Sequence, residues 1–487
     1  MNLPAVWDYQ LYLLQLEQYE LARYWKLLRL KGLFPPKSGL RKSLHWTLKA
    51  RVIWLLACTI HLAILVFALE RLSRLDYALG FAALGVWVLL ASAGPCLLYT
   101  LSTALLLPAD FFVKRRIIAA ARRKMHRLKN IMVVAIAGSY GKTTMKRVLQ
   151  AVLSAQLPVA ATPESVNTPL GIARFILQEV SPDTTVLILE LGEHYRGDVA
   201  HLCTIAEPNT VIITGINEAH LERMGDVATV AATVFEAVEH AKPKALVVLN
   251  ADDENVRAHC NQIVIPPDRL AFFSAANHPL CRYRIQNEEF LEDGSGIRGT
   301  LTFPEEDACA AIHFHIPLVG THALGTLVAA CLVARHLGLN RTEIQIGISQ
   351  IRPVEHRLQV LKGTDNILII DDSYSGNPAG VQEAIGALSR FRSRRKIYLT
   401  PGLAETGSRA GTLHREIGAA LARVADVVIL IRNSVTPLLA EGLRQSGFQE
   451  RRIVWFEHAA AAHAALPHIL KPGDVILFQN DWGDQYV

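Results

Sequence analysis

The chain has 487 residues, of which 51% are hydrophobic, and a net charge of +6. The mean hydropathy of +0.23 is high for a chain of this length, so we expect a membrane segment beside globular domains, about three domains in all. Seven scattered cysteines without a C-x-x-C pair exclude a zinc site of that type and a disulfide framework, and they fit a reducing compartment.

The first 129 residues predict a membrane-anchoring region. Residues 52–69 form an apolar run of about 18 residues, and residues 77–107 form a second run, which Pro95 is expected to kink. Basic residues flank both outer ends of this hairpin. The charges therefore predict a multi-pass protein of the cell membrane, with both ends of the hairpin and the domains that follow it in the cytoplasm. The alternative is a buried helical hairpin of a soluble domain.

The basic flanks of this hairpin predict contact with anionic lipid headgroups rather than with nucleic acid, because they adjoin the apolar runs. Residues 1–51 mix aromatic and leucine side chains with basic ones. They form either an interfacial amphipathic helix or simply a basic flank, and the sequence leaves both readings open.

From residue 131 onward, apolar strands alternate with helical segments, which predicts an α/β fold with parallel sheets. We expect a central α/β domain over residues 130–352 and a C-terminal, Rossmann-like α/β domain over residues 353–487, with the boundary at Pro353. Residues 262–318 are richer in strand and turn residues and predict an antiparallel insertion or edge. The other strands are expected at residues 186–191, 210–216, 245–250, 367–370, 396–400, 427–431 and 475–478.

A glycine loop between a strand and a helix is the strongest motif of the chain. Its residues are Gly138, Ser139, Tyr140, Gly141, Lys142, Thr143 and Thr144, and a helix is expected over residues 145–153. In such a loop the backbone N–H groups and the helix N-terminus bind phosphate. We expect Lys142 to reach the β- and γ-phosphates of ATP and Thr143 to ligate Mg²⁺. An ordinary strand-to-helix turn is the alternative.

Three later segments of the central domain carry further candidates. Asn167 and Thr168 precede a predicted helix and are candidates for holding a nucleotide-bound metal or a substrate carboxylate. Glu190 ends a buried strand and is a candidate Mg²⁺ ligand, unless it is a strand-end glutamate that faces solvent. His220 follows another strand and offers an imidazole to a metal or a phosphate, although a lone histidine is more often structural.

The C-terminal domain carries its own polar strand end. Asp371 and Asp372 end a predicted strand, and Asp372 is a candidate for the ribose or adenine side of ATP. Arg357, which follows the boundary proline, is a candidate for meeting the phosphates from the same side. The two domains would then hold the nucleotide between them.

These motifs together resemble the Mur ligase family over residues 131–487. The segments GSYGKTT, NTPLG, ELGEHYRGD, NEAHLERMG, NADDEN and DDSYSGNP occur in the family's order, with His-Arg after the boundary proline. Within the family they are most similar to the branch that adds D-alanyl-D-alanine to a UDP-linked muramyl tripeptide. The resemblance implies a Mur-ligase-like central ATPase domain and an ATP- and Mg²⁺-dependent ligase that converts a carboxylate into an acyl phosphate and joins it to an amine.

The resemblance also assigns roles to residues. It implies that Lys142 and Thr143 hold the phosphates and Mg²⁺, and that Glu190 and His220 are metal ligands. It implies nucleotide contacts for Arg357 and Asp372. It implies that Asn377, with Tyr374 in the same segment, binds the incoming dipeptide, so the expected partners are small-molecule, peptide or amino-acid substrates.

Several positions depart from the family pattern. Val234 replaces a lysine that binds a second Mg²⁺, Ala323 replaces the asparagine of the adenine loop, and residues 479–482 do not match the usual C-terminal motif. The membrane hairpin stands where the family has a domain that binds a UDP-sugar. Three hypotheses follow: a ligase of peptidoglycan precursors, a ligase resembling poly-γ-glutamate synthetases that uses a lipid-linked or polymer acceptor, and a non-catalytic ATP-binding scaffold. A partner subunit that completes the site is left open.

Overall fold

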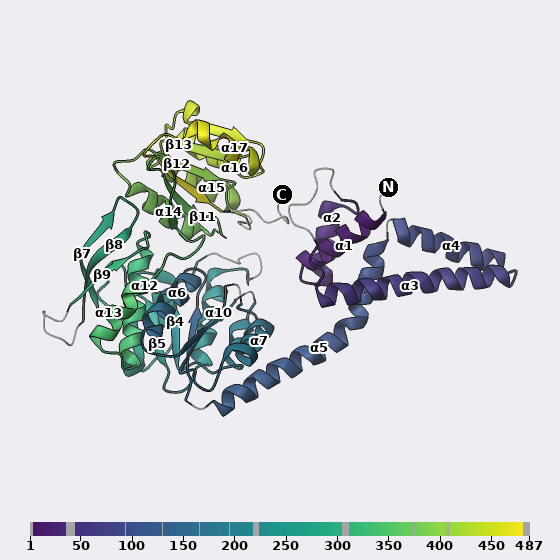
Figure 1. The fold of residues 1–487 in the computed structure, drawn as a ribbon, viewed down its shortest axis with the longest axis horizontal. Helices are drawn as coiled ribbons and strands as arrows, with labels where there is room; N and C mark the ends of the chain where they lie inside the picture. Colours follow the sequence, from purple (N-terminus) through teal and green to yellow (C-terminus); the bar gives the residue numbers. More distant parts are fainter. Residues whose placement is uncertain are drawn as a thin grey trace. The chain divides into compact units, whose positions relative to one another are not determined.

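The computed structural model describes residues 3–35, 44–92, 94–128, 130–164, 166–193, 195–217, 224–303, 311–374, 376–404, 406 and 409–480 (Figure 1). These residues fall into two compact units, which are divided between Arg116 and Ile117. Each unit has a hydrophobic core of its own.

The first unit is helical in the part of the chain that the structure describes. Its helices are α1 (Leu3–Leu16), α2 (Leu21–Lys31), α3 (Leu48–Ser73), α4 (Tyr77–Ser92) and the first part of α5 (Pro95–Arg127). A small core forms where these helices meet and contains Leu11, Tyr24, Ile53 and Tyr99. The predicted apolar run over residues 52–69 lies within α3.

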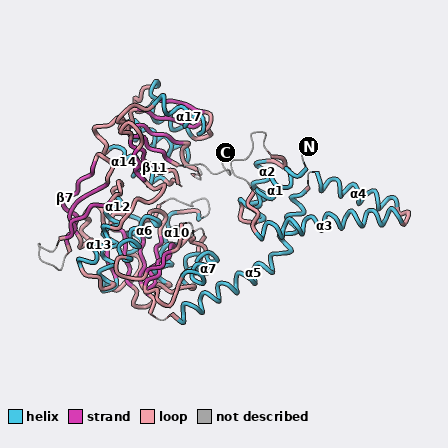
Figure 2. Tube along the Cα trace, in the orientation of Figure 1, coloured by secondary structure: helices cyan, strands magenta, loops and turns pink. Residues whose placement is uncertain are grey.

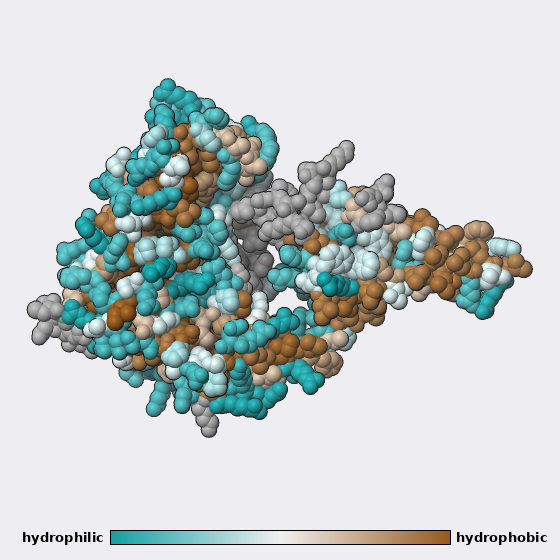
Figure 3. All heavy atoms as spheres, in the orientation of Figure 1, coloured by the Kyte–Doolittle hydropathy of each residue, from teal (hydrophilic) through white to brown (hydrophobic). Residues whose placement is uncertain are grey.

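Helices α3 and α4 lie side by side as a pair joined by a short turn (Figure 2). Much of their surface is apolar and exposed, for example at Leu55, Leu62 and Phe81 (Figure 3). Among the described residues, α3 and α5 are long and apolar enough to cross a membrane, judged by length and composition alone. Two such helices are weak evidence for a membrane protein, because core helices of soluble proteins pass the same test.

The structure corrects the prediction of one apolar span over residues 77–107. Helix α4 ends at Ser92 and α5 begins at Pro95, so the expected kink is a break between two helices. Proline lacks an N–H group and its ring blocks the carbonyl four residues earlier, which favours proline in the first turn of a helix over its interior. Helix α4 is therefore only 16 residues long.

The central domain of the second unit is built on a parallel sheet, as predicted. Within the described residues it has six strands in the order β2-β3-β1-β4-β5-β6, and all neighbouring pairs are parallel. The strands are β1 (Met132–Ala137), β2 (Val159–Ala161), β3 (Val186–Glu190), β4 (Thr210–Ile213), β5 (Leu246–Asn250) and β6 (Leu270–Phe273). Because the strands are parallel, their carboxyl ends meet at one edge of the sheet.

Helices cover both faces of this sheet, which explains why its strands are continuous apolar runs. Side chains alternate along β1: Val134 and Ile136 enter one core, and Val133, Ala135 and Ala137 enter the other. The first face is covered by α6 (Lys142–Ser154), α12 (His322–His336) and α13 (Arg341–Ser349). The second is covered by α7 (Pro169–Glu179), α8 (Asp198–Cys203), α10 (Val227–Glu239) and α11 (Glu254–Cys260).

The last turns of α5 belong to this second unit. Ala121 is buried in the core that α10 helps to form. Arg122 Nη2 donates to Thr204 Oγ1 at 2.6 Å, and Lys124 Nζ donates to the carbonyl of Leu177 at 3.0 Å. Two residues of the basic flank that the sequence assigned to lipid headgroups thus bind the α/β unit itself.

The predicted antiparallel insertion is present as a three-stranded sheet, β7 (Arg284–Leu291), β8 (Gly296–Thr302) and β9 (Ile312–Ile316). Alternate residues of β9, namely Ile312, Phe314 and Ile316, enter the core beneath α12. The predicted range of residues 262–318 also contains the short helix η1 (Pro267–Arg269) and β6, which belongs to the parallel sheet.

The C-terminal domain holds a second sheet, with the order β10-β11-β15-β12-β13-β14 and β10 antiparallel to the rest. Its strands are β10 (Gln359–Lys362), β11 (Leu368–Asp372), β12 (Lys396–Thr400), β13 (Val427–Ile431), β14 (Ile453–Phe456) and β15 (Val475–Gln479). Its helices are α14 (Pro378–Ser389), α15 (Ala410–Ala422), α16 (Thr436–Gln445), η4 (Glu450–Arg452) and α17 (Ala459–Ile469). Pro353, where we place the domain boundary, lies between α13 and β10.

Candidate active site

The glycine loop connects β1 to α6 at the carboxyl edge of the central sheet. Gly138 and Gly141 have φ angles of +137° and +76°, a region that favours glycine. A side chain on Gly138 would also collide with Thr214 Oγ1. Among the residues that the structure describes, none hydrogen-bonds the buried Ser139 Oγ. The loop therefore curls tightly at a helix N-terminus and holds an unmatched hydroxyl, which is the arrangement expected for a phosphate site.

A second layer of side chains fixes the loop. Tyr140 Oη donates to Asp253 Oδ2 at 2.6 Å, and the same oxygen accepts the backbone N–H of Ile216 at 3.0 Å. Thr214 Oγ1 donates to the carbonyl of Tyr140. Burial, and then the Asp253 carboxylate, raise the pKa of Tyr140 above its usual value, so the phenol remains a donor at neutral pH. Asp253 comes from the NADDEN segment, whose role is thus to hold the loop.

Lys142 begins α6 and is held by a carboxylate that the sequence did not single out. Its Nζ donates to Glu193 Oε1 at 2.7 Å and Oε2 at 2.9 Å, and also to the carbonyl of Gly138. Glu193 follows β3, and its side chain is only 1% exposed. Burial raises the pKa of Glu193, and the Lys142 ammonium opposes that shift.

Glu190 ends β3 and is buried, so the alternative of a solvent-facing glutamate is wrong. Thr143 Oγ1 donates to its two carboxylate oxygens at 3.3 and 3.2 Å. Lys146 Nζ lies 2.8 Å from Glu190 Oε2 and donates to the carbonyl of Pro163 at 3.1 Å. Lys146 is itself 1% exposed, so Glu190 and Lys146 form a buried ion pair. The predicted pair of metal ligands, Thr143 and Glu190, is thus brought together.

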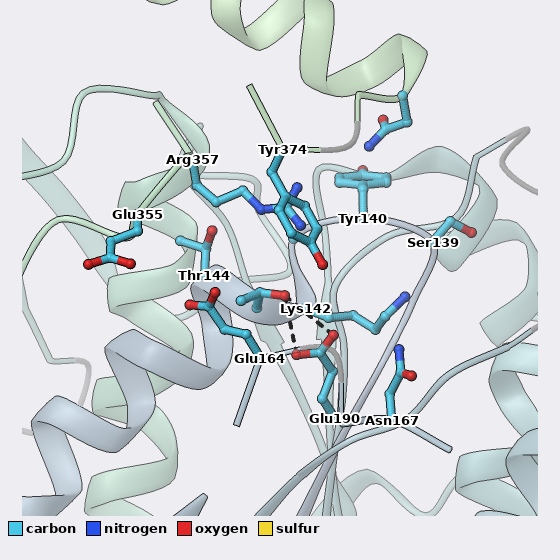
Figure 4. A pocket seen from close by; sticks show the side chains of 13 residues that line it. Ser139, Tyr140, Lys142, Thr144, Glu164, Asn167, Glu190, Glu355, Arg357 and Tyr374 are labelled. Carbon is cyan, nitrogen blue, oxygen red and sulfur yellow. Dashed lines mark hydrogen bonds between the residues drawn. The ribbon is translucent and has the colours of Figure 1, made fainter. Parts of the chain in front are cut away.

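A cavity of about 260 Å³ opens above these residues. It is lined by Ser139, Tyr140, Gly141, Lys142, Thr143, Thr144, Glu164, Asn167 and Glu190 of the central domain, and by Glu355, Arg357, Tyr374 and Asn377 after the boundary. Figure 4 shows Arg357 and Tyr374 facing Lys142 and Glu190 across this space. Residues that lie more than 200 positions apart in the sequence, such as Lys142 and Arg357, therefore meet in one cavity.

The C-terminal wall of the cavity is held by stacking and amide contacts. The guanidinium of Arg357 lies over the ring of Tyr374, 4.2 Å from its centroid. Asn377 caps α14, since its Oδ1 accepts the N–H of Gly380 at 3.0 Å. The same oxygen accepts Asn217 Nδ2 at 3.0 Å, which joins the loop after β4 to the C-terminal domain.

Two other predicted site residues have structural partners and do not line the cavity. Asp372 accepts the N–H of Leu358 at 3.1 Å and Gln479 Nε2 at 2.7 Å, and burial raises its pKa. Its carboxylate ties β11 to the segments before β10 and at the end of β15. Thr168 caps α7 by accepting the N–H of Gly171 at 3.3 Å. The predicted nucleotide contact of Asp372 and substrate contact of Thr168 stay predictions.

The predicted third metal ligand, His220, lies outside the described residues. Among the residues that are described, no group of three or more His, Cys, Asp and Glu side chains is placed to hold a metal ion. Thr143 and Glu190 nevertheless offer two oxygen ligands beside the phosphate loop. That donor set fits Mg²⁺, which commonly binds one or two carboxylates together with phosphate oxygens and water.

The structure also locates two of the positions that depart from the family pattern. Val234 is fully buried in the apolar core under α10, so this position offers no polar ligand to a second metal. Two residues further on, Glu236 accepts the N–H groups of Gly197 at 2.7 Å and Ala200 at 3.0 Å at the start of α8. Ala323 is buried in the first turn of α12.

A glycine loop at a strand end, with a lysine, a hydroxyl and a buried acid, defines a phosphate-binding α/β protein of the nucleotide-dependent class. Residues 136–334 match the family described as Mur ligase middle domain, and residues 356–479 match the family described as Mur ligase, glutamate ligase domain. The chain belongs to the Mur ligase family.

Relatives of known name support this assignment. A UDP-N-acetylmuramoyl-tripeptide–D-alanyl-D-alanine ligase of Synechocystis sp. is 25% identical over 380 residues, which cover 78% of this chain and 77% of the relative. The ligase of the same name from Bacillus subtilis is 24% identical, over 72% of this chain and 73% of the relative. The structure of MurF ligase from Thermotoga maritima in complex with ADP has a TM-score of 0.64 and 26% identity, and the match covers 76% of this chain and 80% of that one.

These matches confirm two predictions: the fold class, with its central nucleotide-binding domain and C-terminal α/β domain, and an ATP-dependent ligase of the Mur ligase type. They contradict a third, the location as a multi-pass protein of the cell membrane. Relatives that match more than seven tenths of this chain include proteins named UDP-N-acetylmuramoyl-tripeptide–D-alanyl-D-alanine ligase and a solved MurF of Acinetobacter baumannii. The second predicted span is interrupted at Pro95, and the end of α5 packs on the α/β unit. The membrane prediction is therefore wrong in this form, and α3 and α5 alone are weak evidence for an anchor.

Proposed function

We propose that this chain is an ATP- and Mg²⁺-dependent ligase that joins a carboxylate to an amine through an acyl phosphate, and that it acts on a peptidoglycan precursor as MurF does. The observation that carries the proposal is the shared cavity. In it, the phosphate loop and Glu190 of the central domain face Arg357, Tyr374 and Asn377 of the C-terminal domain.

The reaction has two steps. An oxygen of the substrate carboxylate attacks the γ-phosphorus of ATP, and the bond from this phosphorus to the β–γ bridging oxygen breaks, which yields an acyl phosphate and ADP. The amine nitrogen then attacks the acyl carbon, loses a proton and displaces inorganic phosphate as the carbon–oxygen bond breaks. Negative charge develops on phosphoryl oxygens in the first step and on the carbonyl oxygen in the second.

The residues of the cavity suit this charge. The loop N–H groups and Lys142 stabilise phosphate oxygens from the floor, and Arg357 adds a cation from the opposite wall. Mg²⁺, when bound, neutralises charge on the phosphate chain, and the Thr143 hydroxyl and Glu190 carboxylate would hold it. Asn377 and Tyr374 line the same wall and are proposed to position the incoming amine.

A second candidate keeps this chemistry and changes the acceptor to a lipid-linked or polymer carboxylate. One observation favours it: the family matches begin at residue 136, and the described residues before Ile117 form a separate helical unit. Acceptor recognition by that unit would then differ from that of the relatives named above. The proposal includes no membrane location.

The test is phosphate release by the purified full-length chain with Mg²⁺-ATP. The acceptor and amine panel contains UDP-muramyl-tripeptide with D-alanyl-D-alanine, glutamate, and lipid-linked precursors. We expect release with the UDP-muramyl pair. Release only with another acceptor would replace the MurF-type substrate with the second candidate. No release with any pair, together with ATP binding that needs Lys142, would favour the non-catalytic scaffold.

The matched variants are Lys142→Ala and Lys244→Ala. Lys142 lines the cavity, whereas Lys244 is exposed before β5 and lies outside the cavity lining. We expect Lys142→Ala to reduce ATP-dependent phosphate release by about 100-fold or more, because the transferred phosphoryl group loses a cation. Lys244→Ala should leave the rate unchanged. Equal rates for the two variants would remove the phosphate-loop assignment.

A further inference from the structure

Glu193 is a buried carboxylate that the proposed reaction leaves without a role. It lies directly behind the phosphate loop, contacts Lys142 with both oxygens, and does not line the cavity. Its side chain is almost wholly excluded from solvent. A buried carboxylate is costly unless it is paired, so its partner matters to the local structure.

The contacts of Lys142 show that Glu193 uses two of the hydrogen-bond donors of its ammonium group. A lysine ammonium has three N–H donors. Three acceptors surround this one: Glu193 Oε1, Glu193 Oε2 and the carbonyl of Gly138. The hydrogen-bonding capacity of Lys142 is therefore filled by the protein itself, although Lys142 belongs to the cavity lining. A phosphate oxygen can receive a hydrogen bond from Lys142 only if one of these acceptors gives way.

We propose that Glu193 is a positioning residue for Lys142, and that the phosphate chain of a nucleoside di- or triphosphate replaces its carboxylate on the lysine. The side chain of Glu193 is the acceptor that can rotate away, whereas the Gly138 carbonyl is part of the loop backbone. The inference rests on the proposed function, because it assumes that the loop binds a nucleotide.

The exchange has a consequence for affinity. When only a fraction of the protein is in the state that binds a ligand, the apparent affinity for that ligand falls in proportion to this fraction. The pair of Lys142 and Glu193 thus lowers the affinity for phosphate chains and leaves contacts to the nucleoside untouched. Substituting Glu193 by glutamine keeps the shape of the side chain and removes the charge that competes with phosphate.

The experiment measures the dissociation constants of ATP, ADP and adenosine by isothermal titration calorimetry on the full chain. We expect Glu193→Gln to bind ATP and ADP about fivefold more tightly than the wild type, with adenosine unchanged. Lys142→Ala and the double variant Lys142→Ala/Glu193→Gln complete a double-mutant cycle. In the absence of Lys142, the glutamine substitution should have little effect on ATP binding.

Glu164→Gln is the matched control, because Glu164 is a carboxylate of the same cavity that pairs with Arg147 at 3.0 Å and not with Lys142. Equal tightening by Glu164→Gln and Glu193→Gln would mean a general charge effect and would overturn the exchange. Unchanged or weaker ATP binding by Glu193→Gln would overturn it as well. Glu193→Ala, with folding checked by thermal unfolding, repeats the comparison if the glutamine variant is unstable.

The outcome for Lys142 separates this inference from the proposed function. If Lys142→Ala binds ATP as tightly as the wild type, the phosphate-loop assignment fails, and the inference fails with it. If ATP binding depends on Lys142 but does not tighten in Glu193→Gln, only the role of Glu193 is lost.

Discussion

The central and C-terminal sheets are both layered α/β structures, but their carboxyl edges carry different chemistry. After β1 and β3, the central domain places Lys142 with Glu193 and Lys146 with Glu190, in two ion pairs whose carboxylates are buried. The C-terminal domain instead offers the stack of Arg357 on Tyr374 and the amide of Asn377, all partly exposed. Its strand-end Asp372 is bound within its own domain.

The proposed nucleotide site combines these two kinds of surface. The Glu190–Lys146 pair is buried and needs both partners in place before any ligand arrives, so this part of the central domain is preorganised. Stacked and exposed groups lose less interaction energy than buried charges when a partner is removed. In the C-terminal domain they contribute mainly by orienting the ligand that the central domain binds. Substitutions in the central-domain lining of the cavity should therefore have larger effects than substitutions in its C-terminal lining.

Among the substitutions that test this comparison, the largest combined effect on activity and stability is expected for Glu190→Ala. It removes a candidate Mg²⁺ ligand and leaves Lys146 as a buried, unpaired cation. We expect phosphate release to fall by about 100-fold and the free energy of unfolding to fall by about 3 kcal/mol. Coupled phosphate-release assays and urea unfolding measure the two quantities.

Lys146→Met is the matched variant for that experiment. It breaks the same ion pair but keeps the Glu190 oxygens beside Thr143. The stability loss should be similar, about 3 kcal/mol, and the activity loss smaller. If both variants lose activity equally, Glu190 acts through folding rather than as a metal ligand. The expected difference between the central and C-terminal sides of the cavity would then have no support from this residue.

An intermediate effect is expected for Arg357→Ala. Loss of one charge-assisted contact to phosphate should raise KM for ATP about tenfold, with a smaller change in stability. Arg432→Ala is the control, because Arg432 lies over Trp455 of the same domain at 5.0 Å but outside the cavity lining. A comparable rise in KM for the control would indicate that loss of any arginine–aromatic stack in the domain raises KM. The effect would then not depend on the position of Arg357 in the cavity lining.

The smallest effect is expected for the amide contact between domains. Asn217→Ala removes the hydrogen bond to Asn377 and keeps the cap of α14. A neutral hydrogen bond contributes about 1 kcal/mol, so KM for the substrates should rise about fivefold at most. Steady-state kinetics in both ATP and amine will show which substrate is affected.

Asn377→Ser sharpens the same comparison. Serine can cap α14 in place of asparagine but is too short to keep the amide contact with Asn217. Similar kinetics for Asn217→Ala and Asn377→Ser would assign the effect to the bridge between domains. A much larger loss in Asn377→Ser would instead support direct contact between Asn377 and the amine substrate.

Sequence reasoning identified the features that depend on neighbouring residues. The apolar runs predicted β1, β3, β4 and β5 and, in the C-terminal sheet, β11, β12, β13 and β15, but not β10 or β14. The glycine loop predicted the start of α6 close to its observed position. Glu190 was found because it ends a buried strand, and Thr143 because it follows the loop lysine. These signals are local, since strand burial and loop curvature depend on a few consecutive side chains.

Other site residues carried weaker signals. Lys146 has the helical spacing of four residues from Lys142, which places both on one face of α6, and this spacing was available from the sequence. Glu193 lies within the ELGEHYRGD segment but has no periodicity to mark it. Asp253 belongs to the NADDEN segment, and its contact with Tyr140 spans more than 100 residues of sequence.

The parallel α/β fold, the phosphate loop and the family of this chain were predictable from the sequence, because each depends on short runs of neighbouring residues. Folding, by contrast, set the partners of the charged side chains: Lys142 for Glu193, Lys146 for Glu190, and hydrogen-bond donors of its own domain for Asp372. It also brought Arg357 and Tyr374 to the loop and ended α4 before Pro95. A charge or a stacked ring is stabilised by the groups within a few ångströms of it. Folding, rather than sequence order, selects those neighbours.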